Sequence, residues 1–145
     1  MSLLAAPPDI LRWSPRSVGH GDCAVAALEL ACGVTYENAL AAALTVDSAV
    51  LSRGLTNQEI IRSAALLGWK GKVHRHFDLI EDTGILCVYQ PRVKNSAHVV
   101  YLWEGRIIEP KSDRCQLWLS APQFLAHYHY NATRLIVFKE EREAK

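Results

Sequence analysis

A nearly uninterrupted apolar stretch runs from Cys23 to Cys32, with Glu29 as its only charged residue. A helix that is apolar on almost all sides is normally buried inside a domain, so the stretch predicts a central helix. Asp22 is suited to cap its amino end, because a short carboxylate accepts hydrogen bonds from the free backbone N–H groups of a first turn. Gly33 is suited to the left-handed position that follows a last turn. We therefore expect a buried helix whose first residue is Cys23.

Two further helices are predicted downstream of this one. Thr35 is placed to cap a helix that runs from Tyr36 to about residue 44 and carries apolar residues on one face. The run Thr56-Asn57-Gln58-Glu59 has the form of a capping box, in which the threonine hydroxyl and the glutamate carboxylate each bond a backbone N–H. It predicts a third helix, from Asn57 to Leu67. We expect the first two helices to form a hairpin.

The chain changes character after Gly68. Short segments rich in β-branched and aromatic residues, bounded by Gly, Pro, Asn and Asp, are typical of strands. The predicted strands are Lys70–Phe77, Ile85–Gln90, Ala97–Trp103, Arg106–Glu109 and Arg134–Lys139. Ser120 is suited to cap a short helix before the last of them. The pattern predicts an α+β fold, with amino-terminal helices packed on one side of a carboxy-terminal antiparallel sheet.

Length and composition indicate one ordinary domain. The chain has 145 residues, and neither an internal repeat nor a linker divides it, so we expect residues 1–145 to form a single domain. Three prolines within residues 1–18 predict an extended lead-in. The tail from Glu140 onwards consists of charged residues and alanine, so we expect residues 140–145 to fray.

The charge balance argues against polyanionic partners. Sixteen Lys and Arg residues oppose fifteen Asp and Glu residues, which leaves a formal charge of +1 and no basic footprint for nucleic acid or an anionic membrane. No apolar run approaches the roughly 20 residues that span a bilayer, and the amino terminus lacks the pattern of a secretory signal. We therefore expect a cytoplasmic protein without a nucleic-acid or membrane partner.

The cysteine and histidine spacings do not favour a metal site. The four cysteines are far apart and include no Cys-x-x-Cys pair, so neither a zinc ribbon nor a dense disulfide framework is indicated. Two histidine pairs occur, His74 with His76 and His127 with His129, but no cysteine or carboxylate joins them at a metal-site spacing. We expect neither a metal nor a cofactor.

Cys23 differs from the other cysteines in its position at the start of a predicted helix. The positive end of the helix dipole favours a thiolate there, and glycines at positions 19 and 21 leave the approach to the sulfur uncrowded. The charge of Asp22 would oppose the thiolate. The alternative is a small buried hydrophobe, which is the interpretation we adopt for Cys32, Cys87 and Cys115.

A predicted hairpin brings a histidine and a carboxylate together. If Glu104-Gly105 forms a two-residue loop, counting outward places Val100 opposite Glu109. Side chains alternate along a strand, so His98 shares a face with Val100 and becomes a diagonal neighbour of Glu109. The carboxylate could then fix the imidazole in one tautomer. The alternatives are a core histidine bonded to backbone and a solvated glutamate at a strand end.

If Cys23 lies against the second imidazole nitrogen, a thiolate and imidazolium pair oriented by an acid results, which activates a cysteine for acyl transfer. Six segments occur in a matching order: Gly21-Asp22-Cys23-Ala24-Val25-Ala26-Ala27-Leu28, Gly33-Val34-Thr35-Tyr36-Glu37, Gly54-Leu55-Thr56, Thr83-Gly84-Ile85-Leu86, Ala97-His98-Val99-Val100 and Gly105-Arg106-Ile107-Ile108-Glu109-Pro110. Together they resemble the papain-like cysteine peptidases of the bacteriocin-leader-processing (double-glycine) type. The resemblance implies a papain-like fold, a peptide or protein substrate, Cys23 as nucleophile, His98 as general base, and Glu109 at the family's acid, which is commonly an aspartate followed by proline.

The sequence departs from the family pattern near the nucleophile. Members usually carry a glycine after the cysteine and a glutamine about six residues before it that stabilises the oxyanion, where this chain has Ala24 and Ser17. Either His20 and the backbone N–H of Cys23 take over that task, or the oxyanion hole is incomplete and His20 is a surface residue. Two hypotheses follow: a cysteine hydrolase acting through an acyl-enzyme on Cys23, and a papain-like binding module with weak or no activity.

Overall fold

The computed structural model describes residues 22–94, 96–110 and 115–141, which form helices followed by an antiparallel sheet. The helices are α2 (Asp22–Cys32), α3 (Tyr36–Val46), α4 (Val50–Arg53), α5 (Asn57–Leu66) and α6 (Ala121–Tyr128). The strands are β1 (Trp69–His74), β2 (Gly84–Tyr89), β3 (His98–Trp103), β4 (Arg106–Pro110), β5 (Cys115–Trp118) and β6 (Asn131–Glu140). The predicted α+β class is confirmed. The lead-in of residues 1–18 lies outside the described residues.

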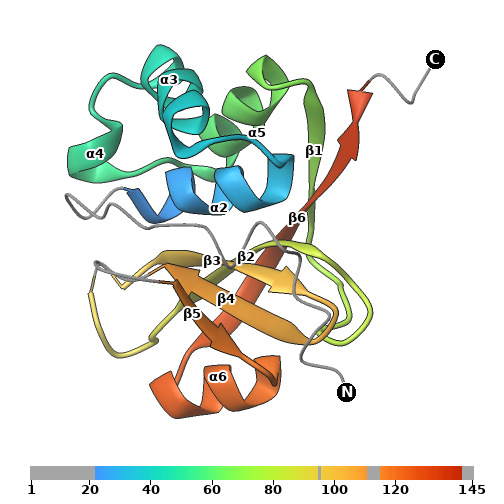
Figure 1. The fold of residues 1–145 in the computed structure, drawn as a ribbon. Helices are drawn as coiled ribbons and strands as arrows, with labels where there is room; N and C mark the ends of the chain where they lie inside the picture. The colour runs from blue at the N-terminus through green and yellow to red at the C-terminus, as the bar shows by residue number, and fades with distance from the viewer. Residues whose placement is uncertain (1–21, 95, 111–114, 142–145) are drawn as a thin grey trace.

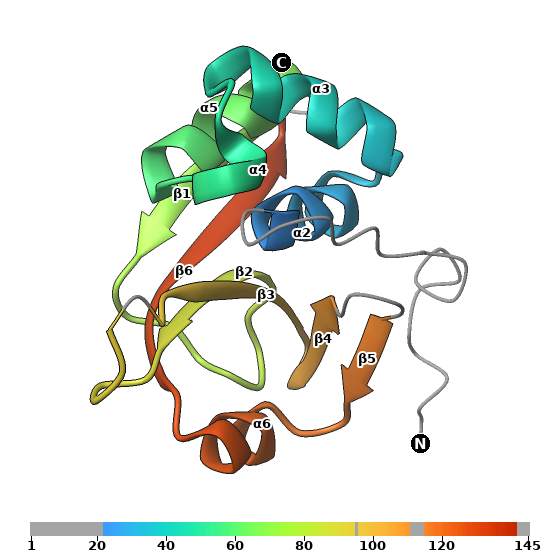
Figure 2. The same cartoon turned by 90° about the vertical axis from the view of Figure 1, so that its left-hand side faces the viewer.

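The sheet has the strand order β1-β6-β2-β3-β4-β5, and every neighbouring pair is antiparallel. The last strand in the sequence, β6, therefore lies between β1 and β2. Within the sheet it extends from the end near α6 to the level of α5 (Figure 1; Figure 2). β6 extends to Glu140, and the N–H of Glu141 donates to the carbonyl of Gly68, whereas residues 142–145 of the tail that we expect to fray lie outside the described part.

Helix α2 is the central helix that the apolar stretch predicted. Residues 24–28 are at most 2 % exposed, and α2 contacts α3 and α5 on one side and β2 and β3 on the other (Figure 1). Gly33 has φ +64°, and its N–H donates to the carbonyl of Glu29, as expected for a left-handed position after the last turn. One boundary differs from the prediction: the helix begins at Asp22 itself, which therefore belongs to the first turn rather than preceding it.

The two other predicted helix starts are confirmed by their caps. The hydroxyl of Thr35 accepts a hydrogen bond from the N–H of Asn38 at the start of α3. At the start of α5 both bonds of the capping box are present, from the N–H of Glu59 to the Thr56 hydroxyl and from the N–H of Thr56 to the Glu59 carboxylate. The sequence pattern missed the short helix α4 and the four-residue strand β5.

The sheet separates two hydrophobic cores. Ile85 on β2 belongs to the core under the amino-terminal helices, whereas the next residue, Leu86, belongs to the core that contains the fully buried Phe124 of α6. The amino-terminal helices thus pack on one side of the sheet, as expected, whereas the short carboxy-terminal helix α6 covers the opposite face (Figure 2). The physical reason is that β2 and β3 carry apolar residues at successive positions, so both faces of the sheet require a cover. Across the described ranges, every helix is too short or too polar to cross a membrane.

Candidate active site

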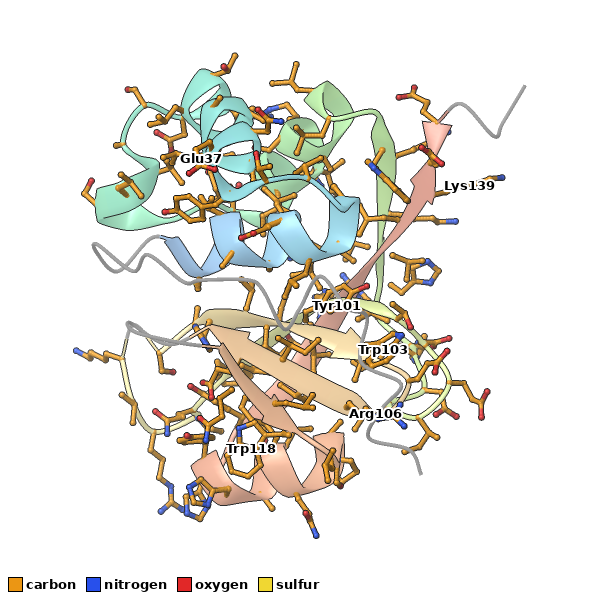
Figure 3. All side chains as sticks on the ribbon, in the orientation of Figure 1. Glu37, Tyr101, Trp103, Arg106, Trp118 and Lys139 are labelled. Carbon is orange, nitrogen blue, oxygen red and sulfur yellow. The ribbon has the colours of Figure 1, made fainter. Side chains whose placement is uncertain are left out.

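The site begins with the turn between β3 and β4. Glu104 has φ +48° and Gly105 has φ +83°, and Trp103 pairs with Arg106, which confirms the predicted two-residue hairpin loop. Positive φ at both loop residues is the geometry that matches the twist of the flanking strands. The guanidinium carbon of Arg106 lies 5.1 Å from the centre of the Trp103 ring, and the two side chains lie together at this end of the sheet (Figure 3). The loop thus fixes which residues of the two strands face each other.

That register places His98 beside Glu109, as predicted. The Nε2 atom of His98 lies 3.6 Å from Oε2 of Glu109, an ion-pair distance. The Glu109 side chain is 6 % exposed, because β4 lies between β3 and β5, where Glu109 pairs with Gln116. The alternative of a solvated glutamate at a strand end is therefore wrong. A buried carboxylate beside an imidazole fixes the orientation of the ring.

Cys23 reaches the same imidazole from the other layer of the fold. Helix α2 packs on β3, and the side chains of Cys23 and His98 share a hydrogen bond. Burial lowers the pKa of His98, but the interactions with Cys23 and Glu109 outweigh it and raise the pKa to about 9. The structure thus brings Cys23, His98 and Glu109 together in the order that the sequence predicted. Their catalytic roles remain predictions.

A pocket of about 560 Å³ opens at Cys23 and His98. Its wall includes Cys23 from α2, His98 from β3, and residues from β2 and from the segment that leads into α5. The lining residues are Cys23, Ala24, Gly54, Leu55, Thr56, Asn57, Cys87, Val88, Tyr89, Ala97, His98, Val99 and Thr133. Among these described residues His98 is the basic side chain, and Thr56, Asn57 and Thr133 contribute uncharged polar groups.

Two residues of this pocket were not recognised from the sequence. The thiol of Cys87 donates a hydrogen bond to Oδ1 of Asn57, with 3.3 Å between sulfur and oxygen. Burial raises the pKa of Cys87 to about 11. The nearby Arg134 acts to lower this pKa, and Cys23 acts to raise it. Cys87 is half-buried: it packs against the core under the amino-terminal helices, as expected of a small hydrophobe, and it also lines the pocket, which was not expected. No sequence signal separates Cys87 from other apolar strand residues, whereas Asn57 could have been noticed as the first residue after a capping threonine.

Of the other described cysteine and histidine side chains, none lines this pocket; they are Cys32, His74, His76, His127 and His129. Cys32 is buried, and burial raises the pKa of its thiol to about 12, so it behaves as the predicted small hydrophobe. In the part of the chain that the structure describes, no three His, Cys, Asp or Glu residues form a group that could hold a metal ion. The predicted accessory residue His20, Ser17, and the side chains of Asp22 and Cys115 lie outside the described residues.

Comparison with known proteins adds no family to this geometry. No protein-family model matches the chain, and no curated protein matches its sequence.

Proposed function

We propose that the chain is a papain-like cysteine hydrolase that cleaves a peptide or related amide bond through an acyl-enzyme on Cys23. The observation that carries the proposal is the hydrogen bond between Cys23 and His98, with Glu109 behind the imidazole. Nucleophile, base and orienting acid form the triad that activates a thiol for acyl transfer. The resemblance noted in the sequence supports the same assignment.

The proposed reaction starts from a thiolate and an imidazolium. A histidine with a pKa of about 9 is protonated at neutral pH, and an imidazolium favours the ionised sulfur beside it. The Cys23 sulfur attacks the amide carbonyl and the C–N bond breaks, while the imidazolium of His98 gives its proton to the leaving amine. The neutral imidazole then takes a proton from water, whose oxygen attacks the thioester and releases the acid and Cys23. Glu109 holds Nε2, so Nδ1 is the nitrogen that we assign to these transfers.

The proposed hydrolysis also requires hydrogen-bond donors to the oxyanion. Backbone N–H groups of a first helical turn are directed out of the amino end of the helix, and Cys23 is the second residue of α2. We assign the N–H of Cys23 as one donor to the oxyanion and His20 as the second. Asp22 keeps its assignment as an accessory residue at the helix start. If His20 does not serve, the chain is the catalytically weak binding module.

Selective alkylation of Cys23 tests the proposal. At pH 7 iodoacetamide should label Cys23 before Cys32, Cys87 and Cys115, as measured by peptide mapping after limited reaction. His98→Ala should slow the labelling of Cys23 about tenfold or more, because a thiol of ordinary pKa is only a few per cent ionised at this pH.

The matched control is His76→Ala, which removes an exposed histidine that does not line the pocket and should leave the rate unchanged. His98→Gln provides a second variant in case alanine disturbs folding. Equal labelling of all four cysteines in the native protein would contradict the proposal and favour a binding module.

A further inference from the structure

The polar side chains of the pocket differ in how many of their hydrogen-bonding groups already have a partner. The Thr56 hydroxyl accepts the N–H of Glu59 in the capping box, and the Thr133 hydroxyl donates to the carbonyl of Cys87. Asn57 accepts the Cys87 thiol through Oδ1, and within the described residues its Nδ2 atom makes no hydrogen bond. Asn57 is half-buried and part of the pocket wall. Its two N–H groups are therefore available to a molecule that enters the pocket.

The Cys87 thiol determines which end of the Asn57 amide meets the pocket. With a pKa of about 11, the thiol keeps its proton at neutral pH and acts as a donor. A donor at this place selects the amide orientation in which the oxygen faces the sulfur and the NH₂ group faces away from it. The backbone of Asn57 is fixed, because the capping box joins Thr56 to Glu59 across the first turn of α5. The pair is thus a preorganised hydrogen-bond donor.

We propose that Asn57, oriented by Cys87, is a substrate-binding residue that donates from Nδ2 to a backbone carbonyl oxygen of a peptide. The inference rests on the proposed hydrolase function and names the chemistry of its substrate. A peptide carbonyl is the acceptor that an amide donor matches, and Asn57 lies in the same pocket wall as Cys23 and His98.

Two alkylating reagents separate this inference from the proposed function. The first is iodoacetamide, which needs only a reactive sulfur, and the second is an acetylated alanine tripeptide chloromethyl ketone, which also occupies the pocket. In Asn57→Asp the carboxylate still accepts the Cys87 thiol but cannot donate. The ratio of the peptide rate to the iodoacetamide rate should fall about tenfold, the usual effect of losing one buried hydrogen bond. Taking the ratio removes any change in the ionisation of Cys23.

Three controls complete the experiment. Gln58→Asp places the same charge on the neighbouring exposed residue and should leave the ratio unchanged. Cys87→Ser keeps a donor toward Asn57 and should preserve the ratio, whereas Cys87→Ala should lower it.

The outcomes are distinct. An unchanged ratio in Asn57→Asp, with Cys23 still labelled by both reagents, would overturn the inference and leave the hydrolase proposal standing. A native protein in which neither reagent prefers Cys23 would overturn both.

Discussion

At the residue scale, the proposed chemistry depends on the protonation of one half-buried imidazole, that of His98. Burial alone would make His98 neutral, but the interactions with Cys23 and Glu109 reverse the direction and raise its pKa from 6.5 to about 9. The folded protein therefore binds this proton more tightly than the unfolded chain does. The resulting stabilisation is complete below about pH 6.5 and is lost as the pH rises through 9.

This shift is directly measurable. An NMR titration of the His98 ring protons should give a midpoint near 9 in the native protein. Glu109→Gln removes a charge that favours the imidazolium, so its midpoint should be lower, and Cys23→Ala should lower the midpoint for the same reason. The exposed His76 serves as an internal reference, because it lies outside the pocket. A native midpoint for His98 at or below 6.5 would contradict the proposed ion pair.

At the element scale, the β3–β4 hairpin aligns the base with the acid through its two-residue turn. The positive φ of Glu104 costs conformational energy, because glutamate adopts the left-handed region less readily than asparagine. Glu104 is exposed, and its carboxylate lies 3.9 Å from the guanidinium of Arg106, an ion pair of little energetic weight. The turn therefore sets the register of the hairpin, but glutamate is an unfavourable residue at its first position.

Changing the turn residue should improve stability without changing the site. Glu104→Asn should raise the free energy of unfolding by about 0.5 kcal/mol, because asparagine tolerates this backbone conformation and the register is kept. Gly105→Ala should lower the free energy of unfolding by about 1 kcal/mol, because an alanine at φ +83° is strained. Urea unfolding measures both changes. Iodoacetamide labelling of Cys23 should be the same in Glu104→Asn and the native protein; a destabilised Glu104→Asn would contradict this account of the turn.

The hairpin also shows what local sequence rules can predict. Turn length and strand alternation were sufficient to pair His98 with Glu109, because both are set by the nearest residues. Capping residues located α3 and α5 for the same reason. The roles of Asn57 and Cys87 could not be predicted, since they depend on contact between α5 and β2, which are distant in sequence. The cover of the second sheet face by α6 depends likewise on tertiary packing.

At the scale of the whole molecule, β6 joins the edge strand β1 to the rest of the sheet. It pairs with β1, which follows α5, and with β2, which forms part of the pocket wall. The close approach of β2 to β6 requires a glycine: a Cβ atom at Gly84 would overlap the backbone carbonyl oxygen of Ile136. Backbone cannot move away as the end of a side chain can, so this contact tolerates no larger residue.

A substitution at this position tests the role of β6. Gly84→Ala should lower the free energy of unfolding by about 2 to 3 kcal/mol, measured by urea denaturation. Gly71→Ala, on β1, is the matched control, because the added Cβ would meet only the side chains of Ile61 and Phe138, at 3.1 Å. Gly71→Ala should therefore lower the free energy of unfolding by less than Gly84→Ala does. Equal stability of Gly84→Ala and the native protein would show that β6 can shift away from β2.

The packing of α2 on β3 bears on how the proposed activity would be lost. The sulfur of Cys23 belongs to the helical layer and the imidazole of His98 to the sheet. An event that separates the two layers would part these groups and abolish the proposed chemistry. The reactivity of a single thiol would then report on the docking of the two halves of the molecule.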